Sequence, residues 1–445
     1  MSEWREVKIG DIAEKIAMGP FGSNIKVETF VDSGVPVISG SHLRESRLRD
    51  GEYNFVTEDH AERMRNSIVF RGDVIFTHAG NISNLSYIPE SSLYDRYVIS
   101  QRQFYLRCNL TRADPCFITY FFHSPSGRHK LLANSSQVGV PSIAQPSSYL
   151  KSISILLPPL HEQKAIAHIL STLDDKIDQL RKTNSVLEDM ASALFKSWFV
   201  DFDPVKAKQE NRPTGLPKDV DDLFPDSFED SALGPIPKGW RVASLADFAT
   251  FQSGYSFKGK DWTSNGHPVV KIGNVKPGMI SFDGCSFVSE RTVVGLSRFK
   301  LHRGDLLVGM TGYVGETGLM PEMNPCAYLN QRVGRISTNM GLKDLGFVYA
   351  LTRDISFKQF AENQSHGSAQ ANVSGSELLK LPTVHPNTAL ISTYNNLIYP
   401  VIDAVISNYE MSRSLTNLRD TLLPKLISGE LRVPEAEQMV AELGL

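Results

Sequence analysis

The segment of this chain that comes nearest to a known catalytic motif is Gly254-Tyr-Ser-Phe-Lys-Gly259-Lys260, which has the glycine and lysine spacing of a phosphate-cradling loop. The next position holds Asp261 where a Ser or Thr would bind magnesium, and a carboxylate there repels phosphate. No apolar strand precedes the segment, so we expect a turn. The sequence also lacks an Asn/Asp-Pro-Pro-Tyr box, a Gly-x-Ser-x-Gly elbow and a His-Glu-x-x-His pair. It therefore predicts a non-catalytic chain.

Polar side chains in loops could recognise DNA, because Arg, Asn and Gln form paired hydrogen bonds with base edges in the major groove. In the first half of the chain the candidates are Ser39, Ser41, His42, Arg44, Gln101, Arg102, Gln137 and Ser142. In the second half they are Lys271, Asn274, Gln331, Arg332, Gln364, His366, Ser368, Gln370 and Asn372. Each of these residues has a structural alternative. The repeated Gln-Arg pairs fit shared scaffolding or phosphate contacts better than different base preferences.

The distribution of charge decides which part of the chain could face phosphates. The net charge of −3 is unfavourable for a nucleic-acid binder, but residues 238–386 carry 16 basic and 11 acidic side chains. Residues 201–230 carry 4 basic and 9 acidic side chains. Residues 102–130 hold five basic residues and only Asp114, which is equally consistent with a solvated surface. The second globular region therefore suits DNA, and the segment before it does not.

A weak internal duplication organises the chain. Trp4-Arg5 recurs as Trp240-Arg241, Gly34-Val-Pro36 as Gly266-His-Pro268, Arg71-Gly72-Asp73 as Arg303-Gly304-Asp305, and Gln101-Arg102 as Gln331-Arg332. The matches keep their order. The apolar runs that follow the two Arg-Gly-Asp segments, 74–76 and 306–308, predict strands entered from a turn. Each copy is expected to be a globular head of short strands with one or two helices.

Each head is followed by a pattern typical of a long coiled-coil helix. The first begins after Pro158-Pro159 and has its seam at Ile166, Leu170, Leu173, Ile177, Leu180, Asn184, Leu187 and Leu194. The second has its seam at Tyr394, Ile398, Val401, Val405, Asn408, Ser412, Leu415 and Leu422, and Pro400 should kink or interrupt it. Asn184 is interpreted as fixing the register of the pair, with a hydrated break as the alternative, and leucine there should raise stability.

These patterns predict an α+β protein in which two globular domains are separated by two long antiparallel helices with pseudo-two-fold symmetry. The expected segments are a first head at 1–157, a first helix at 158–200, an acidic, proline-rich linker at 201–237, a second head at 238–386, a second helix at 387–430 and a tail at 431–445. The linker should be extended, with Phe224 and Phe228 docked on a neighbour. A helix of roughly 58 Å could hold the heads at opposite ends of a rod, on two half-sites of DNA.

Four segments are similar to recurrent segments of the specificity subunits of type I restriction-modification systems. They are Leu157-Pro-Pro-Leu-His-Glu-Gln163, residues 193–204, Pro235-Ile-Pro-Lys-Gly-Trp240 and residues 418–431. The resemblance covers nearly the whole chain. It implies two target-recognition domains that read an asymmetric bipartite site in double-stranded DNA, for DNA methylation and defence against foreign DNA. The second helix departs from the family pattern, because it begins Pro386-Asn-Thr-Ala-Leu390.

The same resemblance implies the partners. Two methyltransferase subunits would bind S-adenosylmethionine and methylate adenine, and restriction motor-nuclease subunits would use ATP and Mg²⁺; this chain would hold no cofactor or metal. The alternative function is a coiled-coil scaffold that binds proteins and never contacts DNA. The sequence shows no signal peptide and no apolar run of membrane-spanning length, so we expect a cytoplasmic protein. Its four separated cysteines, without zinc-ligand spacing, are expected to be free thiols.

Overall fold

The computed structural model describes residues 4–20, 25–136, 138–366 and 371–442. The chain divides into two compact units. The first unit comprises Met1–Lys176 and Leu415–Leu445, and the second comprises Ile177–Ser414. Each unit therefore contains one head together with a part of each long helix. No helix in the described residues is both long and apolar enough to cross a bilayer.

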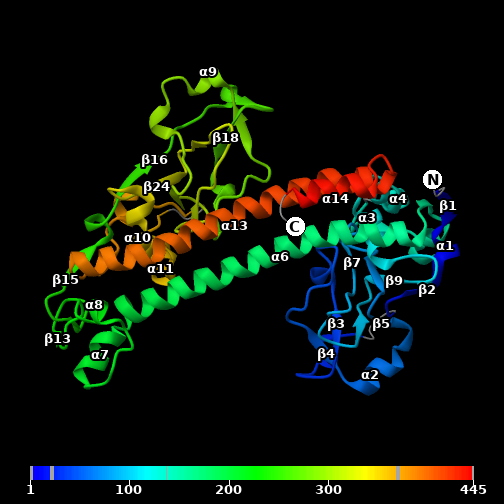
Figure 1. Ribbon diagram of the computed structural model, residues 1–445, viewed down its shortest axis with the longest axis horizontal. Coiled ribbons are helices and arrows are strands. Elements are labelled where there is room, and N and C mark those ends of the chain that lie inside the picture. Colours follow the sequence, from blue (N-terminus) through cyan, green and yellow to red (C-terminus); the bar gives the residue numbers. More distant parts are fainter. Residues whose placement is uncertain (1–3, 21–24, 137, 367–370, 443–445) are drawn as a thin grey trace. The chain divides into compact units, whose positions relative to one another are not determined.

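The head of the first unit contains two four-stranded sheets (Figure 1). One has the order β2 (Ala13–Met18), β9 (Gln103–Cys108), β6 (Val74–Thr77) and β7 (Leu85–Tyr87). The other has the order β4 (Asn54–Val56), β3 (Val35–Ile38), β8 (Arg96–Ile99) and β5 (Ile68–Phe70). Only β3 and β8 run parallel among these pairs. Ile38, Ile75 and Tyr105 are fully buried in one core cluster, to which both sheets contribute.

The head of the second unit repeats the central part of this strand order, with differences at the sheet edges. Its larger sheet has the order β16 (Thr250–Ser253), β24 (Val333–Ser337), β21 (Leu306–Gly309), β22 (Thr317–Leu319) and β19 (Gly278–Met279). Its smaller sheet has the order β17 (Trp262–Thr263), β20 (Ser286–Val288), β18 (His267–Val270) and β23 (Tyr328–Leu329). The parallel pair recurs between β18 and β23. The duplication predicted from the sequence is therefore a duplication of topology.

The ends of each head are joined by a further antiparallel strand pair. In the first head β1 (Arg5–Lys8) pairs with β12 (Ser154–Leu157). In the second head β15 (Arg241–Ser244) pairs with β25 (Pro382–His385). These pairs close each head immediately before the adjoining long helix begins.

The two Arg-Gly-Asp segments form turns before β6 and β21, as predicted. Gly72 and Gly304 adopt φ of 84° and 85°, a region that favours glycine. Asp73 accepts a hydrogen bond from the Phe70 N–H and two from Arg107, at 2.6 and 2.8 Å. Asp305 likewise accepts from the His302 N–H and from Arg335. Both aspartates therefore connect a turn to the neighbouring strand.

Each head also carries a helical pair. In the first it consists of α3 (Pro115–His123) and α4 (Pro125–Leu132), and in the second of α10 (Leu345–Arg353) and α11 (Ile355–Asn363). The single residue between the helices is Ser124 in the first pair and Asp354 in the second. Its side chain accepts a backbone N–H of the following helix and so caps that helix.

The predicted long helices are α6 (Leu160–Phe195) and α13 (Thr388–Ser428) (Figure 1). They run antiparallel in the second unit, because Asn184 contacts Asn408 while Ala191, further along α6, contacts Tyr394. The expected interruption at Pro400 was wrong, since α13 continues through it. Pro400 is exposed on the helix surface, so water can hydrogen-bond the carbonyl that lacks an N–H partner.

The seam residues are buried unevenly. Ile166, Leu170, Leu173 and Ile177 are buried in α6, whereas Leu180, Asn184, Leu187 and Leu194 are partly exposed. In α13 Ile398, Val405, Leu415 and Leu422 are buried and Val401 is partly exposed. Leu390, Ile402 and Ile406 are also buried, in a cluster with residues of the second head. The apolar face of α13 is therefore wider than a two-helix seam.

The segment 201–237 is folded, which corrects the expectation of an extended linker. A five-residue π-helix, Lys196–Val200, follows α6. The segment then forms α7 (Asp203–Gln209), α8 (Lys218–Asp221) and the short strands β13 (Phe228–Glu229) and β14 (Ile236–Pro237). The Phe224 ring packs edge-on against Trp198, with ring centroids 5.2 Å apart. Burial of this aromatic side chain stabilises the folded segment, although its acidic composition disfavours compact packing. The predicted docking of Phe224 is confirmed, and Phe228 is partly buried against the same cluster.

Candidate nucleic-acid interface

Loops that are distant in the sequence meet at one place in the first head. The His78 N–H donates to the Arg102 carbonyl at 2.9 Å, and the Ile143 N–H donates to the His78 carbonyl at 2.9 Å. The Gly80 N–H donates to the Pro141 carbonyl at 2.9 Å. The side-chain amide of Asn84 donates to the Gly40 carbonyl at 3.0 Å. These bonds join four loop segments, 39–42, 77–84, 100–103 and 134–143, into one cluster.

The second head repeats the three backbone bonds. The Met310 N–H donates to the Arg332 carbonyl at 3.1 Å, and the Val373 N–H donates to the Met310 carbonyl at 3.0 Å. The Gly312 N–H donates to the Ala371 carbonyl at 3.1 Å. Each of these bonds has its counterpart in the first head at the duplicated position. The two heads therefore support their loops on one common backbone frame.

Glycines allow the close approaches in this frame. A Cβ on Gly19 would lie 2.1 Å from the Ser100 carbonyl oxygen, and a Cβ on Gly254 would lie 2.2 Å from that of Asn330. Gly254 is thus a packing residue. The Asp261 carboxylate accepts the Lys258 N–H at 2.6 Å and closes a single 3-10 turn, Gly259–Asp261. A phosphate-cradling loop opens a longer helix, so this segment is the expected turn.

Several predicted residues of the first head lie in its loop cluster. Gln101 and Arg102 are exposed, and their carbonyls accept hydrogen bonds from His78. Ser39 and Ser41 lie side by side, with their hydroxyl oxygens 2.7 Å apart. Ser142 is the first residue of β11 (Ser142–Ile143), which pairs with β10 (Ser135–Ser136) in a hairpin. Arg44 is exposed. Gln137 lies outside the described residues.

His42 has a structural role. Its Nδ1 accepts the Ser39 N–H at 3.0 Å, and its Nε2 lies 3.2 Å from the Glu52 carbonyl oxygen, to which it can donate in the neutral tautomer. Burial lowers the pKa of His42, against the opposing effect of the Glu52 carbonyl. Both ring nitrogens are therefore engaged within the head, which leaves His42 without a free group for a base edge.

The predicted residues of the second head divide in the same way. Gln331 and Arg332 are exposed, as their duplicates are. Asn274 is buried and closes its own turn, because its oxygen accepts the Lys271 N–H and its amide donates to the Ser281 carbonyl. Lys271 donates to Ser286 and lies 3.7 Å from the centroid of the Trp262 ring. Asn274 is therefore not available to DNA.

The remaining predicted residues lie at or near the antiparallel bridge between His366 and Asn372. The Asn372 side-chain oxygen accepts the Thr311 hydroxyl at 2.8 Å, and the His366 ring lies 3.2 Å from Glu377. Gln364 is partly exposed. Ser368 and Gln370 lie outside the described residues.

Sequence reasoning missed other exposed residues in these clusters. In the first head they include Asn81 and two valines of the hairpin, Val138 and Val140, which are 90% and 61% exposed. In the second head Tyr313 is 63% exposed. The sequence feature that could have located Asn81 and Tyr313 is the glycine before each of them. Gly80 and Gly312 follow the duplicated strands at equal distances.

Comparison with known proteins identifies the protein family. The model of the type I restriction modification DNA specificity domain matches residues 1–189 and 237–413. The chain belongs to this family. Its two matched stretches correspond to the duplicated heads and parts of the helices that follow them. It is a DNA specificity subunit of a type I restriction-modification system.

Individual relatives agree with this assignment. The HindI specificity subunit of Haemophilus influenzae is 22% identical, over 97% of this chain and 100% of the relative. The MjaVIII specificity subunit of Methanocaldococcus jannaschii is 23% identical, over 97% and 93%. The crystal structure of the type I S subunit from M. genitalium has a TM-score of 0.56 at 16% identity and 96% coverage of both chains, so it shares the fold.

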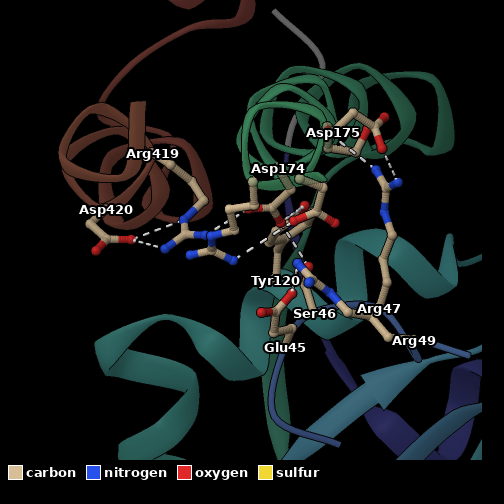
Figure 2. Close-up of polar contacts among 12 residues, drawn as sticks. Glu45, Ser46, Arg47, Arg49, Tyr120, Asp174, Asp175, Arg419 and Asp420 are labelled. Atoms are coloured by element: carbon tan, nitrogen blue, oxygen red, sulfur yellow. Dashed lines mark hydrogen bonds and ion pairs between the residues drawn. The ribbon is translucent and has the colours of Figure 1, made fainter. Parts of the chain in front are cut away.

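A polar network attaches the first head of the specificity subunit to both long helices within the first unit. Figure 2 shows Asp174, on α6, between the head and α13. Its carboxylate accepts hydrogen bonds from the Tyr120 and Ser46 hydroxyls, at 2.6 and 2.7 Å, and from Arg419 on α13, at 2.6 Å. Beside it, Arg47 of the head forms an ion pair with Asp175.

The environment of Asp174 favours its charged form. Burial alone would raise the pKa, but the Arg419 charge and the hydrogen bonds from Tyr120, Arg419 and Ser46 outweigh burial and lower it below its usual value. The Asp174 side chain is only 12% exposed. A buried, charged carboxylate with three partners holds the head, α6 and α13 of this unit in one arrangement.

The second unit attaches its head to α13 through different residues. Arg303, from the duplicated Arg-Gly-Asp segment, pairs with Asp403 at 2.6 Å and with Glu410 at 3.2 Å. It also donates to the Ser407 hydroxyl. Its duplicate in the first head, Arg71, instead pairs with Asp95 and the Ser92 carbonyl within that head. The attachment of heads to helices is therefore not duplicated residue by residue.

Proposed function

We propose that each head of this specificity subunit binds one half of an asymmetric, bipartite site in double-stranded DNA. The observation that carries this proposal is the common loop frame, on which the two heads present different exposed side chains. A shared frame gives both heads the same way of approaching a duplex. Different side chains give them different base preferences.

The charge distribution supports DNA as the ligand of this surface. The second head carries an excess of basic residues, and exposed Gln-Arg pairs recur in both loop clusters. Arg side chains bind phosphate oxygens as well as base edges. A protein scaffold that never touches DNA would have no need of either feature.

The long helices are proposed to set the number of unrecognised base pairs between the half-sites. They are also proposed to bind two methyltransferase subunits. These subunits would carry S-adenosylmethionine and methylate adenine. Restriction motor-nuclease subunits, with ATP and Mg²⁺, would join the same complex. The specificity subunit would position these enzymes and supply no reacting group.

Binding and methylation together test the proposal. Duplex DNA carrying the cognate site, found by sequencing methylated DNA from the source cell, should bind with an affinity that falls steeply between 50 and 200 mM salt. Methyl transfer should require the methyltransferase subunit. Absence of DNA binding under every salt condition would favour the protein scaffold, and methyl transfer by a partner-free preparation would contradict the non-catalytic role.

A further inference from the structure

One exposed residue of each head occupies the same place in the common loop frame. Asn81 and Tyr313 each follow a glycine whose N–H donates to a carbonyl of a neighbouring loop, Gly80 to Pro141 and Gly312 to Ala371. The Asn81 carbonyl accepts the Asn84 N–H at 3.0 Å, and the Tyr313 carbonyl accepts the Glu316 N–H at 3.3 Å. Their backbones are therefore held by the same turn, and only their side chains differ.

The base of this turn is also the same in both heads. The Thr77 N–H donates to the Asn84 carbonyl at 3.0 Å, and the Gly309 N–H donates to the Glu316 carbonyl at 2.8 Å. The turn is thus tied to strand β6 or β21 at its base and, through the preceding glycine, to the neighbouring loop. A residue at its tip is presented by a fixed support, which a base-reading side chain requires.

Residues that are identical in the two heads cannot give them different preferences. Gln101-Arg102 and Gln331-Arg332 are such residues, and they suit contacts with phosphates or sugars, which carry no sequence information. Asn81 and Tyr313 differ in chemistry at one position of one frame. This is the combination expected of residues that distinguish half-sites.

The side chains suit different base pairs. An Asn amide carries one acceptor and a donor, which match the N6 amino group and N7 of adenine in the major groove. The Tyr313 ring is apolar, is 63% exposed and has the Lys276 ammonium group 5.9 Å from its centroid. An exposed ring can pack against the thymine methyl group, the apolar feature of the same groove.

We propose that Asn81 and Tyr313 are specificity-determining residues of the two heads. Asn81 pairs with adenine at one position of the first half-site, and Tyr313 packs against a thymine methyl group in the second. This inference rests on the proposed function, because it presupposes that the loop clusters face DNA.

The test is selection from a duplex library randomised over both half-sites. The full-length chain, purified with its methyltransferase subunit, is incubated with the library, and the bound duplexes are sequenced. For Asn81→Asp, which keeps the shape of the side chain but removes its donor, adenine should fall roughly tenfold or more at one position. Cytosine, whose amino group a carboxylate accepts, should rise there. Asn81→Ala should abolish the preference at that position, and the second half-site should stay unchanged in both variants.

Tyr313 is tested with a matched pair of variants. Tyr313→Phe keeps the ring and should retain the thymine preference, whereas Tyr313→Ala should lose it at one position of the second half-site only. Equal loss in both variants would show that the hydroxyl, not the ring, makes the contact, and would overturn the assignment. Thermal unfolding of each variant should match the wild type, because both residues are exposed.

Arg102→Ala is the control for a contact without sequence information. It should weaken binding to all sequences about equally, as expected for a phosphate contact.

Selection by the wild type separates this inference from the proposed function. If the wild type selects a bipartite site and the Asn81 and Tyr313 variants select the same one, these residues are not specificity-determining, while the proposed function stands. If the wild type selects no sequence, the proposed function fails, and the inference fails with it.

Discussion

Single residues in this subunit show why identical sequence does not mean identical role. Asp73 and Asp305 do the same structural task in both heads, as acceptors for a turn and for an arginine of the next strand. Arg71 and Arg303 precede them in the same motif but bind different partners, one within its head and one on α13. The duplicated motif therefore preserves a turn, while its first residue has diverged.

At this scale the first prediction concerns Asp174. Asp174→Asn removes the charge that balances Arg419 in a largely buried site, so the free energy of unfolding should fall by about 3 kcal/mol. Asp420→Asn is the matched control, since Asp420 also binds Arg419 but is 58% exposed, and its loss should cost about 0.5 kcal/mol. Urea denaturation of the three proteins measures the difference. Equal effects of the two substitutions would contradict a structural role for the buried carboxylate.

The same residue predicts a pH dependence. Because the pKa of Asp174 is lowered in the folded protein, its contribution is complete above the ordinary aspartate pKa of about 4 and is lost as the pH falls through the lower folded value. The wild type should therefore lose more stability than Asp174→Asn between pH 5 and pH 3, as followed by thermal unfolding. Equal losses of stability in the two proteins would show that other carboxylates determine the pH dependence.

Sequence reasoning located some candidate site residues but not others. It named Gln101-Arg102 and Gln331-Arg332, which are exposed, because a repeated pair is visible without knowledge of the fold. It did not name Asn81 and Tyr313, for which we propose a role in specificity, because the loops that surround them are brought together by pairing of distant strands. It counted Asn274 as a reader, since an exposed amide and one that closes its own turn look alike in sequence.

At the scale of elements, the helix pattern was readable because it is local and long. The periodicity placed both helices close to their observed bounds, Leu160–Phe195 for α6 and Thr388–Ser428 for α13, but it did not predict that α13 continues through Pro400. The folding of residues 201–237 was not predictable in the same way. Its helices are short, and their stability comes from burial of Val205 and Phe224 in a cluster assembled from distant segments.

The sequence predicts that Asn184→Leu raises thermal stability, but the contacts of Asn184 in the structure predict the opposite. Its amide donates to the Val405 carbonyl at 2.9 Å, and its oxygen accepts the Asn408 amide at 2.8 Å. Asn184→Leu alone should therefore lower the unfolding temperature, because it leaves Asn408 without this partner. The double variant Asn184→Leu, Asn408→Leu should restore or exceed wild-type stability and should permit alternative helix pairings.

Differential scanning calorimetry and light scattering check both parts of this expectation. Asn408→Leu is the reciprocal control and should resemble the first single variant. If each single substitution raised the unfolding temperature and the double substitution added the two gains, the asparagine pair would have no coupling energy. The interpretation that Asn184 and Asn408 fix the register of the two helices would then be wrong.

The fourth prediction uses the helices as a ruler. Asp174–Arg419 and Asn184–Asn408 tie α6 to α13 in the first and second units respectively. Insertion of four residues after Leu180, matched by four after Ser414, adds about one turn between these ties, roughly 6 Å. DNA rises about 3.4 Å per base pair. The preferred gap should grow by one or two base pairs while both half-sites stay the same.

A methylation assay over substrates that differ only in gap length measures this change. Two-residue insertions at the same places are the control, because they rotate each seam by more than half a turn and should damage assembly. An active four-residue variant that still prefers the original gap would mean that the helices bind partners but do not set the distance.

At the scale of the whole molecule, the duplication is the feature that the sequence and the structure share most fully. Both heads share the central part of one strand order, one corresponding parallel pair and one loop frame, although few residues are identical. Each head also closes on itself, through β1 and β12 or through β15 and β25. A head is therefore a unit of packing that could be exchanged without cutting a sheet.

The most direct measurement replaces residues 1–157 with the corresponding head of a relative that has a different site, and sequences the DNA methylated by the resulting complex. The junction follows β12, which ends at Leu157, so the pairing with β1 remains within one head. Because each head is proposed to read its own half-site, one half of the methylated sequence should change to that of the relative and the other half should stay the same. A change of both halves together would contradict the account.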